Sequence, residues 1–259
     1  MTAYGVIGFG RIGQRLTQRL PAAVVLVRPH RSEEAARLVG REQICTTLEA
    51  FLARKPPIVI ECASRRCLVE MGAAVLAAGI DLAPLSLTAF ADPDFERCLM
   101  AAAEAGPGRL LIAPGAIGTL DLLATAREEG LRRVIYRQIK SPAMWRLTPA
   151  SALVDLGAVV ARQIIVRGSV RELAQTFSDN LNTSVGVALA GLGLDRTEAE
   201  LVADPGLSET AHELEVHAAP GNAVLMLGGR DVPPDGDPVD YTTFSLVRML
   251  RRRTARVLI

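Results

Sequence analysis

Two of the chain's three histidines lie five positions apart, at His212 and His217 in the segment HELEVHA. An imidazole has an ordinary pKa of about 6.5, so either ring is suited to act as a general acid or base. If this segment is a strand, side chains alternate between its two faces. His212 then lies with Leu214 and Val216 on an apolar face, whereas His217 lies with two glutamates on a solvent face. The pattern favours His212 as the catalytic candidate, the alternative being a core histidine with satisfied hydrogen bonds.

A glycine-rich loop is the second feature with chemical potential. GVIGFGRIGQRL places Gly8, Gly10 and Gly13 in a GxGxxG pattern between an apolar run and a helical pattern. Gly8 permits the tight turn, Gly10 lets the backbone approach a pyrophosphate, and Gly13 lets the helix pack close to its strand. The helix N-terminus offers unpaired N–H groups to phosphates. The loop, with Arg11 and Ile12, is therefore predicted to bind a dinucleotide, the alternative being a structural glycine turn.

The residue expected to hold the adenosine ribose is an acid about 20 residues further on, at the end of the second strand. In AAVVLVRPHRS, Arg28 stands at that place. A guanidinium attracts a 2′-phosphate, which a carboxylate would repel. This predicts NADP as cofactor, or both NADP and NAD, the alternative being that Arg28 lies on a solvated loop.

Small residues follow several predicted strands. Cys62 and Ala63 in IECAS, and Ala116 in APGAIG, come where a parallel strand reaches its carboxyl end, the edge at which open α/β sheets bind ligands. Their backbone is expected to lie against a nicotinamide ring. Asn182 and Thr183 precede a helical run, so either could be an N-cap. Asn182 could instead bind the nicotinamide carboxamide or a substrate carboxylate.

Lys140, in QIKSP, is a candidate partner for a substrate carboxylate, with a surface lysine as the equal alternative. The sequence arranges no paired carboxylates, no Ser/His/Asp set and no Cys/His cluster of metal-ligand spacing. We therefore expect neither hydrolytic nor metal-dependent chemistry.

These residues need elements that position them. The first ~115 residues alternate apolar runs with helical patterns, which predicts a doubly wound, Rossmann-type α/β domain around a parallel sheet. The predicted strands are AYGVIGF, AAVVLV, PIVIECA, DLAPLSL and RLLIAP. Further on, VIYRQIK, ARQIIVRG, AELVADP, HELEVHAA and NAVLMLG predict a sheet with antiparallel pairs. Helices are expected in TPASALVDLGA, SVRELAQTF and NTSVGVALAGLG, and RDVPPDGDPVD is expected to be an exposed connector.

The bulk composition narrows the classes of partner. Lys and Arg total 29 against 28 Asp and Glu, a net charge of +1, which gives no electrostatic reason to expect nucleic acid or an anionic membrane. Gly79, Asp81 and Pro84 interrupt the most membrane-like window, which predicts a helix, a turn and a buried strand. No signal-peptide pattern opens the chain. Four cysteines without a CxxC pair predict reduced thiols in a cytoplasmic protein.

Seven segments together resemble one known family. In chain order they are GVIGFGRIG, IECAS, SLTAFAD, APGAIGTLD, QIKSP, DNLNTSVGVAL and VADPGLSETAHELEV. Over nearly the whole chain this order resembles L-aspartate dehydrogenases. The resemblance implies a dinucleotide-binding domain over residues 1–115, completed by a C-terminal helix over 239–259. It also implies an inserted α+β catalytic domain over 116–238 and, as usual in the family, a homodimer.

The resemblance further implies an activity. This is the reversible NAD(P)-dependent oxidative deamination of L-aspartate, through iminoaspartate, to oxaloacetate and ammonia, which in some organisms feeds the synthesis of NAD. The family's active histidine falls on His212, which would activate water for attack on the imine or protonate nitrogen in reverse. The nicotinamide contacts fall on Ala116 and Asn182, and Lys140 and Thr183 are taken as substrate-binding residues.

Two departures from the family pattern leave alternatives open. Some members carry Asp where Arg28 stands and Asn where Thr210 stands, so neither NAD preference nor strict aspartate specificity carries over. One alternative is an NADP-linked dehydrogenase or reductase of another small amino or oxo dicarboxylate. A second is a nucleotide-sensing protein that binds dinucleotide without turnover, and a histidine on the apolar face argues against it.

Overall fold

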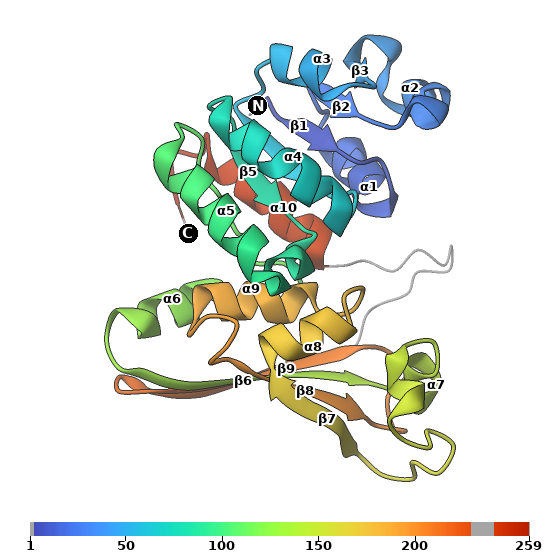
Figure 1. Cartoon of the computed structure of the whole chain (residues 1–259), viewed down its shortest axis with the longest axis vertical. Coiled ribbons are helices and arrows are strands. Elements are labelled where there is room, and N and C mark those ends of the chain that lie inside the picture. The colour runs from blue at the N-terminus through green and yellow to red at the C-terminus, as the bar shows by residue number, and fades with distance from the viewer. Residues whose placement is uncertain (1–2, 229–240, 259) are drawn as a thin grey trace. The chain divides into compact units, whose positions relative to one another are not determined.

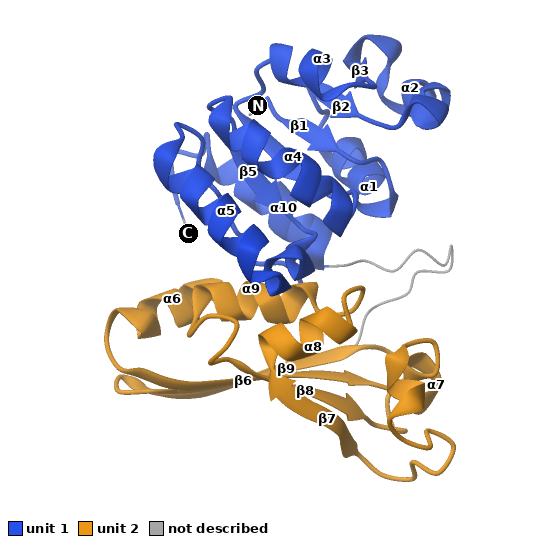
Figure 2. Cartoon of the chain, viewed as in Figure 1, with its two compact units in different colours: residues 1–116, 241–259 blue, residues 117–240 orange. Residues whose placement is uncertain are grey.

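A computed structural model describes residues 3–228 and 241–258 of the chain. The connector predicted over 230–240 lies outside the described residues, and so do both ends of the helix predicted over 239–259. The chain forms two compact units (Figures 1 and 2). Unit 1 comprises Met1–Ala116 and Tyr241–Ile259, and unit 2 comprises Ile117–Asp240.

Unit 1 contains the predicted parallel sheet, in the order β3-β2-β1-β4-β5. Its strands are β1 (Gly5–Ile7), β2 (Val24–Leu26), β3 (Ile44–Cys45), β4 (Ile58–Glu61) and β5 (Asp81–Pro84). Its α-helices are α1 (Arg11–Arg19), α2 (Ser32–Val39), α3 (Leu48–Ala53), α4 (Arg65–Ala77), α5 (Pro93–Ala105) and α10 (Tyr241–Arg252). Short 3-10 turns are η1 (Pro29–Arg31), η2 (Arg41–Gln43) and η3 (Leu87–Ala91).

Both faces of this sheet are buried, which explains why its strands are apolar throughout. On one face, Val6 and Ile60 pack in a core cluster with Leu246 and Leu250 of α10. Figure 1 shows α4 and α5 on the opposite side of the sheet from α10. The last described helix of the chain is therefore part of the core that the first strands form.

Unit 2 is built on a second sheet, in the order β10-β9-β6-β8-β7. Its strands are β6 (Leu131–Lys140), β7 (Gln163–Ser169), β8 (Glu198–Ala203), β9 (Ala211–Ala218) and β10 (Gly221–Leu227). Its helices are α6 (Leu120–Glu128), α7 (Pro142–Trp145), α8 (Val170–Thr176) and α9 (Asn182–Ala190), with the 3-10 turn η4 (Pro149–Ala152). The prediction of a sheet with antiparallel pairs is confirmed: β6–β9, β9–β10 and β7–β8 are antiparallel, whereas β6 and β8 are parallel.

The two faces of this sheet differ in chemistry. Figure 2 shows α6, α8 and α9 over one face. Buried side chains alternate with half-buried ones along β9, and we assign the buried set to this helix-covered face. The opposite face carries a ladder of charges, in which Arg137 is paired with Glu200 at 2.5 Å, Glu213 at 2.6 Å and Glu215 at 2.8 Å. The alternation that separates the two histidines is thus an alternation between a helix-covered face and a charged face.

Two predicted elements are wrong. RLLIAP is not a strand: it makes one isolated bridge, Leu110 to Leu82, because Pro84, the next residue of β5 in register, has no N–H to donate to the Leu111 carbonyl. TPASALVDLGA holds only the 3-10 turn η4, because the Asp155 carboxylate accepts a hydrogen bond from the Gly157 N–H and closes a turn instead of a helix.

Several boundaries also differ from expectation. Residues 253–258 are not helical, so the helix predicted over 239–259 is described only as α10. The strand β3 and the helices α3, α6 and α7 were not predicted. Two of them are too short to show a period in the sequence, because β3 has two residues and α7 only four. The membrane-like window is confirmed as helix, turn and strand, from α4 to β5. In the stretches from 3 to 228 and 241 to 258, no helix combines the length and apolarity that crossing a bilayer requires.

Candidate functional site

The predicted cofactor loops meet at one edge of unit 1. β1 lies between β2 and β4, so connections diverge on its two sides, and such a switch point is where open α/β sheets bind ligands. The Cys62 N–H donates to the carbonyl of Ile7 at 2.9 Å, and the Cys62 thiol contacts the carbonyl of Gly8 at 3.5 Å. The glycine loop and the loop after β4 are therefore neighbours.

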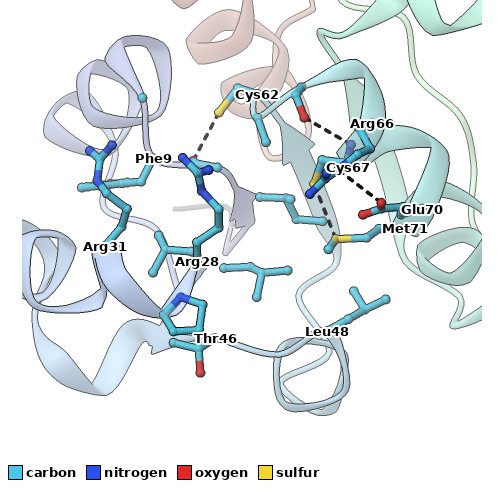
Figure 3. A pocket seen from close by; sticks show the side chains of 18 residues that line it. Phe9, Arg28, Arg31, Thr46, Leu48, Cys62, Arg66, Cys67, Glu70 and Met71 are labelled. Atoms are coloured by element: carbon cyan, nitrogen blue, oxygen red, sulfur yellow. Dashed lines mark hydrogen bonds and ion pairs between the residues drawn. The ribbon is translucent and has the colours of Figure 1, made fainter.

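A cavity of about 520 Å³ lies beside these loops (Figure 3). Five residues predicted to bind cofactor line it: Gly8, Gly10, Arg28, Cys62 and Ala63. The other three predicted residues of the motif, Arg11, Ile12 and Gly13, form the first turn of α1 and do not line the cavity.

The lining also includes residues that the sequence analysis did not single out: Thr46, Leu48, Arg66, Cys67, Glu70 and Met71. They come from the end of β3, the start of α3 and the first turns of α4. Because β3 is only two residues long, it left no strand pattern that would have placed Thr46 beside the glycine loop.

The glycines of the motif have the geometry that a dinucleotide cradle needs. Gly8 has a φ of +95°, and a Cβ there would lie 2.6 Å from the Cβ of Ala63. A Cβ on Gly13 would lie 2.7 Å from the Gly8 carbonyl oxygen, so only glycine allows α1 to pack this close. A Cβ on Gly10 would meet no heavy atom within 4 Å. The fold of unit 1 thus requires glycine at positions 8 and 13, whereas the open space beside Gly10 can receive a pyrophosphate.

Three arginines line the cavity, and their partners differ. Arg31 pairs with Glu34 at 2.6 Å, and Arg66 pairs with Glu70 at 3.3 Å. The guanidinium of Arg28 forms no ion pair or hydrogen bond with any residue the structure describes. Within the described part of the chain, Arg28 therefore has no partner to give up when it offers its cation to a ligand (Figure 3).

A buried carboxylate fixes the loop after β4. Glu61 accepts hydrogen bonds from the N–H groups of Ala63 at 2.8 Å and Ser64 at 3.0 Å, and from the Ser86 hydroxyl at 2.9 Å. Burial raises the pKa of Glu61, and these hydrogen bonds oppose that rise. Glu61 thereby ties the cavity wall after β4 to the segment after β5.

Unit 2 holds the second cluster of chemically competent residues. His212 lies on the helix-covered face of β9 with 8% of its surface exposed. Its Nδ1 is 2.6 Å from the hydroxyl of Tyr136 on β6, and that hydroxyl is also hydrogen-bonded by the side chain of Thr183 on α9. His217 lies on the opposite face, where its Nε2 is 2.7 Å from Glu215.

Lys140 ends β6 on the same face as Tyr136. Its Nζ donates to the side-chain carbonyl of Asn180 at 2.7 Å and stands 4.7 Å from the centre of the Trp145 ring. Burial lowers the pKa of Lys140 to about 8. The side chain is half-buried within unit 2, so the structure does not favour the alternative of a fully solvated surface lysine.

The structure also places the remaining predicted residues. Asn182 is the first residue of α9, whose N-cap is Leu181 and has no side-chain cap bond, so the N-cap interpretation of Asn182 and Thr183 is wrong. Ala116 lies half-buried in a turn at the end of a unit 1 segment. Thr210 directly precedes β9. Contacts of Ala116 or Asn182 with a nicotinamide remain predictions.

A parallel sheet with a glycine cradle and a cavity at its switch point defines unit 1 as a dinucleotide-binding unit of the Rossmann class. Two family models match the chain: "Homoserine dehydrogenase, NAD binding domain" over residues 4–113, and "Aspartate dehydrogenase, C-terminal" over residues 121–253.

Relatives of known name match the chain along nearly its whole length. L-aspartate dehydrogenase from Serratia proteamaculans is 34% identical over 95% of both chains. The enzyme of the same name from Ruegeria pomeroyi is 36% identical over 97% of this chain and 92% of that one. The crystal structure of aspartate dehydrogenase from Thermotoga maritima shares the fold, with a TM-score of 0.80, 22% identity and coverage of 100% of this chain and 99% of that chain. This chain belongs to the L-aspartate dehydrogenase family.

Proposed function

We propose that this chain is an NAD(P)-dependent L-aspartate dehydrogenase. The observation that carries the proposal is the buried His212, held at Nδ1 by Tyr136, in a chain whose other unit presents a dinucleotide cradle. A nicotinamide bound there would supply the hydride acceptor for the α-carbon of aspartate, and hydrolysis of the imine by water would give oxaloacetate and ammonia. Gly8, Gly10, Arg28, Cys62 and Ala63 would hold the cofactor, and Ala116 and Asn182 would contact its nicotinamide end.

The protein's part in the reaction is to move a proton and to hold a dianion. Because Nδ1 of His212 is engaged by Tyr136, Nε2 is the atom that takes a proton from the attacking water. In the reverse direction the same atom gives a proton to nitrogen. Lys140 supplies a cation for a substrate carboxylate and holds it while the proton moves.

The test compares initial rates of oxaloacetate reduction with ammonia for the wild type, His212→Ala and His217→Ala. His212→Ala should lose roughly 10²- to 10⁴-fold in kcat with unchanged cofactor affinity, the usual effect of removing a general acid–base. His217→Ala is the matched control and should keep a near wild-type rate, since His217 lies on the charged face. A wild type that binds NADPH or NADH but turns nothing over would reject the proposal in favour of a nucleotide sensor.

Substrate specificity enters the same experiment. Thr210 stands where some family members carry Asn, so the assay includes a panel of other amino and oxo dicarboxylates. Aspartate and oxaloacetate should have the highest kcat/KM of the panel. A higher kcat/KM for another dicarboxylate would assign the enzyme to that substrate while keeping the fold and His212.

We further propose that the enzyme prefers NADP. Arg28 lines the cavity, lies just after β2 where a ribose-binding acid would stand, and forms no ion pair with the described residues. Arg28→Asp should raise KM for NADP+ and lower KM for NAD+, because a carboxylate repels the 2′-phosphate and accepts from the ribose hydroxyl. Arg37→Asp makes the same charge change on α2 outside the cavity lining and should leave the ratio of KM values unchanged.

A homodimer and a cytoplasmic location complete the proposal. Val224 and Met226, 71% and 56% exposed, lie on the charged face of the unit 2 sheet, opposite Glu215 and Glu213 in register. Apolar side chains on that face support pairing of two copies there. The double variant Val224→Glu, Met226→Glu should be a monomer by light scattering, and the control Leu38→Glu in unit 1 should remain a dimer.

The proposed cytoplasmic location is supported by the cysteines. All four are free thiols, which fits a reducing compartment.

A further inference from the structure

The hydroxyl of Tyr136 connects α9 to the proposed catalytic histidine. Tyr136 and His212 lie on neighbouring antiparallel strands, and the register sets Tyr136 opposite Leu214 and Gln138 opposite His212. Tyr136 is therefore the diagonal neighbour of His212 on the helix-covered face. The two rings are 5.9 Å apart with 31° between their planes, and the hydroxyl reaches Nδ1 at 2.6 Å.

The environment of Tyr136 keeps its hydroxyl protonated. The side chain is fully buried, and burial raises the pKa of Tyr136 far above the working range of an enzyme. A neutral phenol has one proton to donate and can accept another. Its two side-chain partners are His212 at Nδ1 and Thr183.

We propose that Tyr136 is a positioning residue, and that Thr183, Tyr136 and His212 form a hydrogen-bonded relay that holds the imidazole in one tautomer. The Tyr136 hydroxyl accepts a hydrogen bond from the Nδ1–H of His212 and donates its own proton to Thr183. With its proton held on Nδ1, the neutral ring presents a lone pair at Nε2.

One arrangement of this relay serves both directions of a reversible proton transfer. The base is the neutral ring, which takes a proton at Nε2, and the acid is the resulting imidazolium, which gives that proton back. Nδ1 keeps its proton in both forms and stays bonded to Tyr136, so the ring holds one orientation and Nδ1 is never unpaired in a buried site. Thr183, taken from the sequence as a substrate-binding residue, has its side chain in this relay.

The role of Tyr136 rests on the proposed role of His212, so the test needs a readout besides turnover. In protein labelled with ¹⁵N at histidine, the two ring nitrogens report which one carries the proton and whether Nδ1 is hydrogen-bonded. The chain has three histidines. His30 and His217 serve as internal references, and the signals lost in His212→Ala identify His212.

Tyr136→Phe keeps the buried ring and removes the hydroxyl. We expect the Nδ1 signal of His212 to move toward that of an unbonded ring nitrogen, with kcat lowered roughly 10- to 100-fold and KM nearly unchanged. Thr183→Val removes the acceptor of the Tyr136 proton but leaves the bond at Nδ1 in place, and so should lower kcat less. The matched control is Tyr4→Phe in unit 1, another buried tyrosine, whose hydroxyl donates to the carbonyl of Leu20.

Two results would overturn the relay. One is an unchanged Nδ1 signal of His212 in Tyr136→Phe, whatever the activity. The other is a shifted signal with a wild-type kcat. If His212→Ala itself turns over normally, the proposed acid–base role fails instead, and the spectrum still shows whether the hydrogen bond exists.

Discussion

The ammonium of Lys140 donates a hydrogen bond to the side-chain carbonyl of Asn180, 2.7 Å away, at the end of the strand that also carries Tyr136. An amide oxygen orients the ammonium without neutralising it, and burial lowers the pKa of Lys140 to about 8. The Lys140 side chain is therefore protonated below neutral pH and loses its positive charge as the pH rises through 8.

This relationship predicts the pH dependence of substrate binding. At saturating ammonia and cofactor, KM for oxaloacetate should be flat below about pH 7 and should rise above pH 8, by about tenfold per pH unit when only the charged lysine binds. Lys140→Arg keeps its charge throughout and should give a flat KM to pH 9.5. An equal rise in both proteins would assign the titration to another group.

Two glycines of the motif should differ in what they contribute, Gly8 to the stability of the fold and Gly10 to the affinity for cofactor. Gly8→Ala should destabilise the cofactor-free protein by roughly 1 to 3 kcal/mol, because it forces a positive φ on alanine and a clash with Ala63. Gly10→Ala should leave the melting temperature nearly unchanged, since nothing lies within 4 Å of its Cβ, yet weaken NADPH binding at least tenfold. Thermal melts and fluorescence titration with NADPH measure the two effects, and a Gly10→Ala variant that binds normally would place the pyrophosphate elsewhere.

Asp81 predicts how unit 1 responds to acid. Burial disfavours its ionised form, but hydrogen bonds from Arg109 and ion pairing with Arg253 at 2.8 Å prevail and hold the pKa of Asp81 at about 2. Ionised Asp81 therefore stabilises the fold above its unfolded pKa, and this stabilisation is lost as the pH falls from about 4 to 2. Asp81→Asn should cost roughly 2 kcal/mol at pH 7 and almost nothing at pH 2.

Urea denaturation at both pH values tests this prediction. Asp94→Asn, at an exposed ion pair with Arg97, is the control and should change stability by less than about 1 kcal/mol at either pH. A penalty for Asp81→Asn that persists at pH 2 would show that packing, and not charge, is what the carboxylate contributes.

The charged face of unit 2 predicts a non-additive pair of variants. Glu200 is 1% exposed and is held by Arg137 and Arg167, each at 2.5 Å. Arg137→Met should destabilise the protein by about 3 kcal/mol, because it removes one of the two cations on a buried carboxylate. Adding Glu200→Leu should recover part of that loss. Equal or greater destabilisation in the double variant would mean that Arg137 acts chiefly through Glu213 and Glu215.

Local patterns were sufficient for those features that depend on one segment alone. Alternation in HELEVHA places His212 and His217 on opposite faces, and the structure confirms that separation. The glycine loop lies at a strand-to-helix turn, as the GxGxxG spacing predicts. In HELEVHA, the alternation of residue types matches the alternation of side chains along a strand. In the glycine loop, the spacing of the three glycines marks the turn.

Features that depend on two distant segments could not be obtained in this way. Tyr136 shares its parity with Gln138 and Lys140, so the sequence does contain a polar face on VIYRQIK. What it does not contain is the order of the sheet, in which β6 has β9 as its antiparallel neighbour. That pairing spans 76 positions between Tyr136 and His212, and no local period encodes it.

The position of α10 also determines when unit 1 can be completed during synthesis. The face of the sheet that includes Val6 and Ile60 is covered by Leu246 and Leu250, which a ribosome adds only after residues 117–240. At 5–20 residues per second, that interval lasts roughly 6 to 25 s. Through it, the nascent nucleotide-binding unit carries an uncovered apolar face, which is a substrate for chaperones. The unit made first is the last to close.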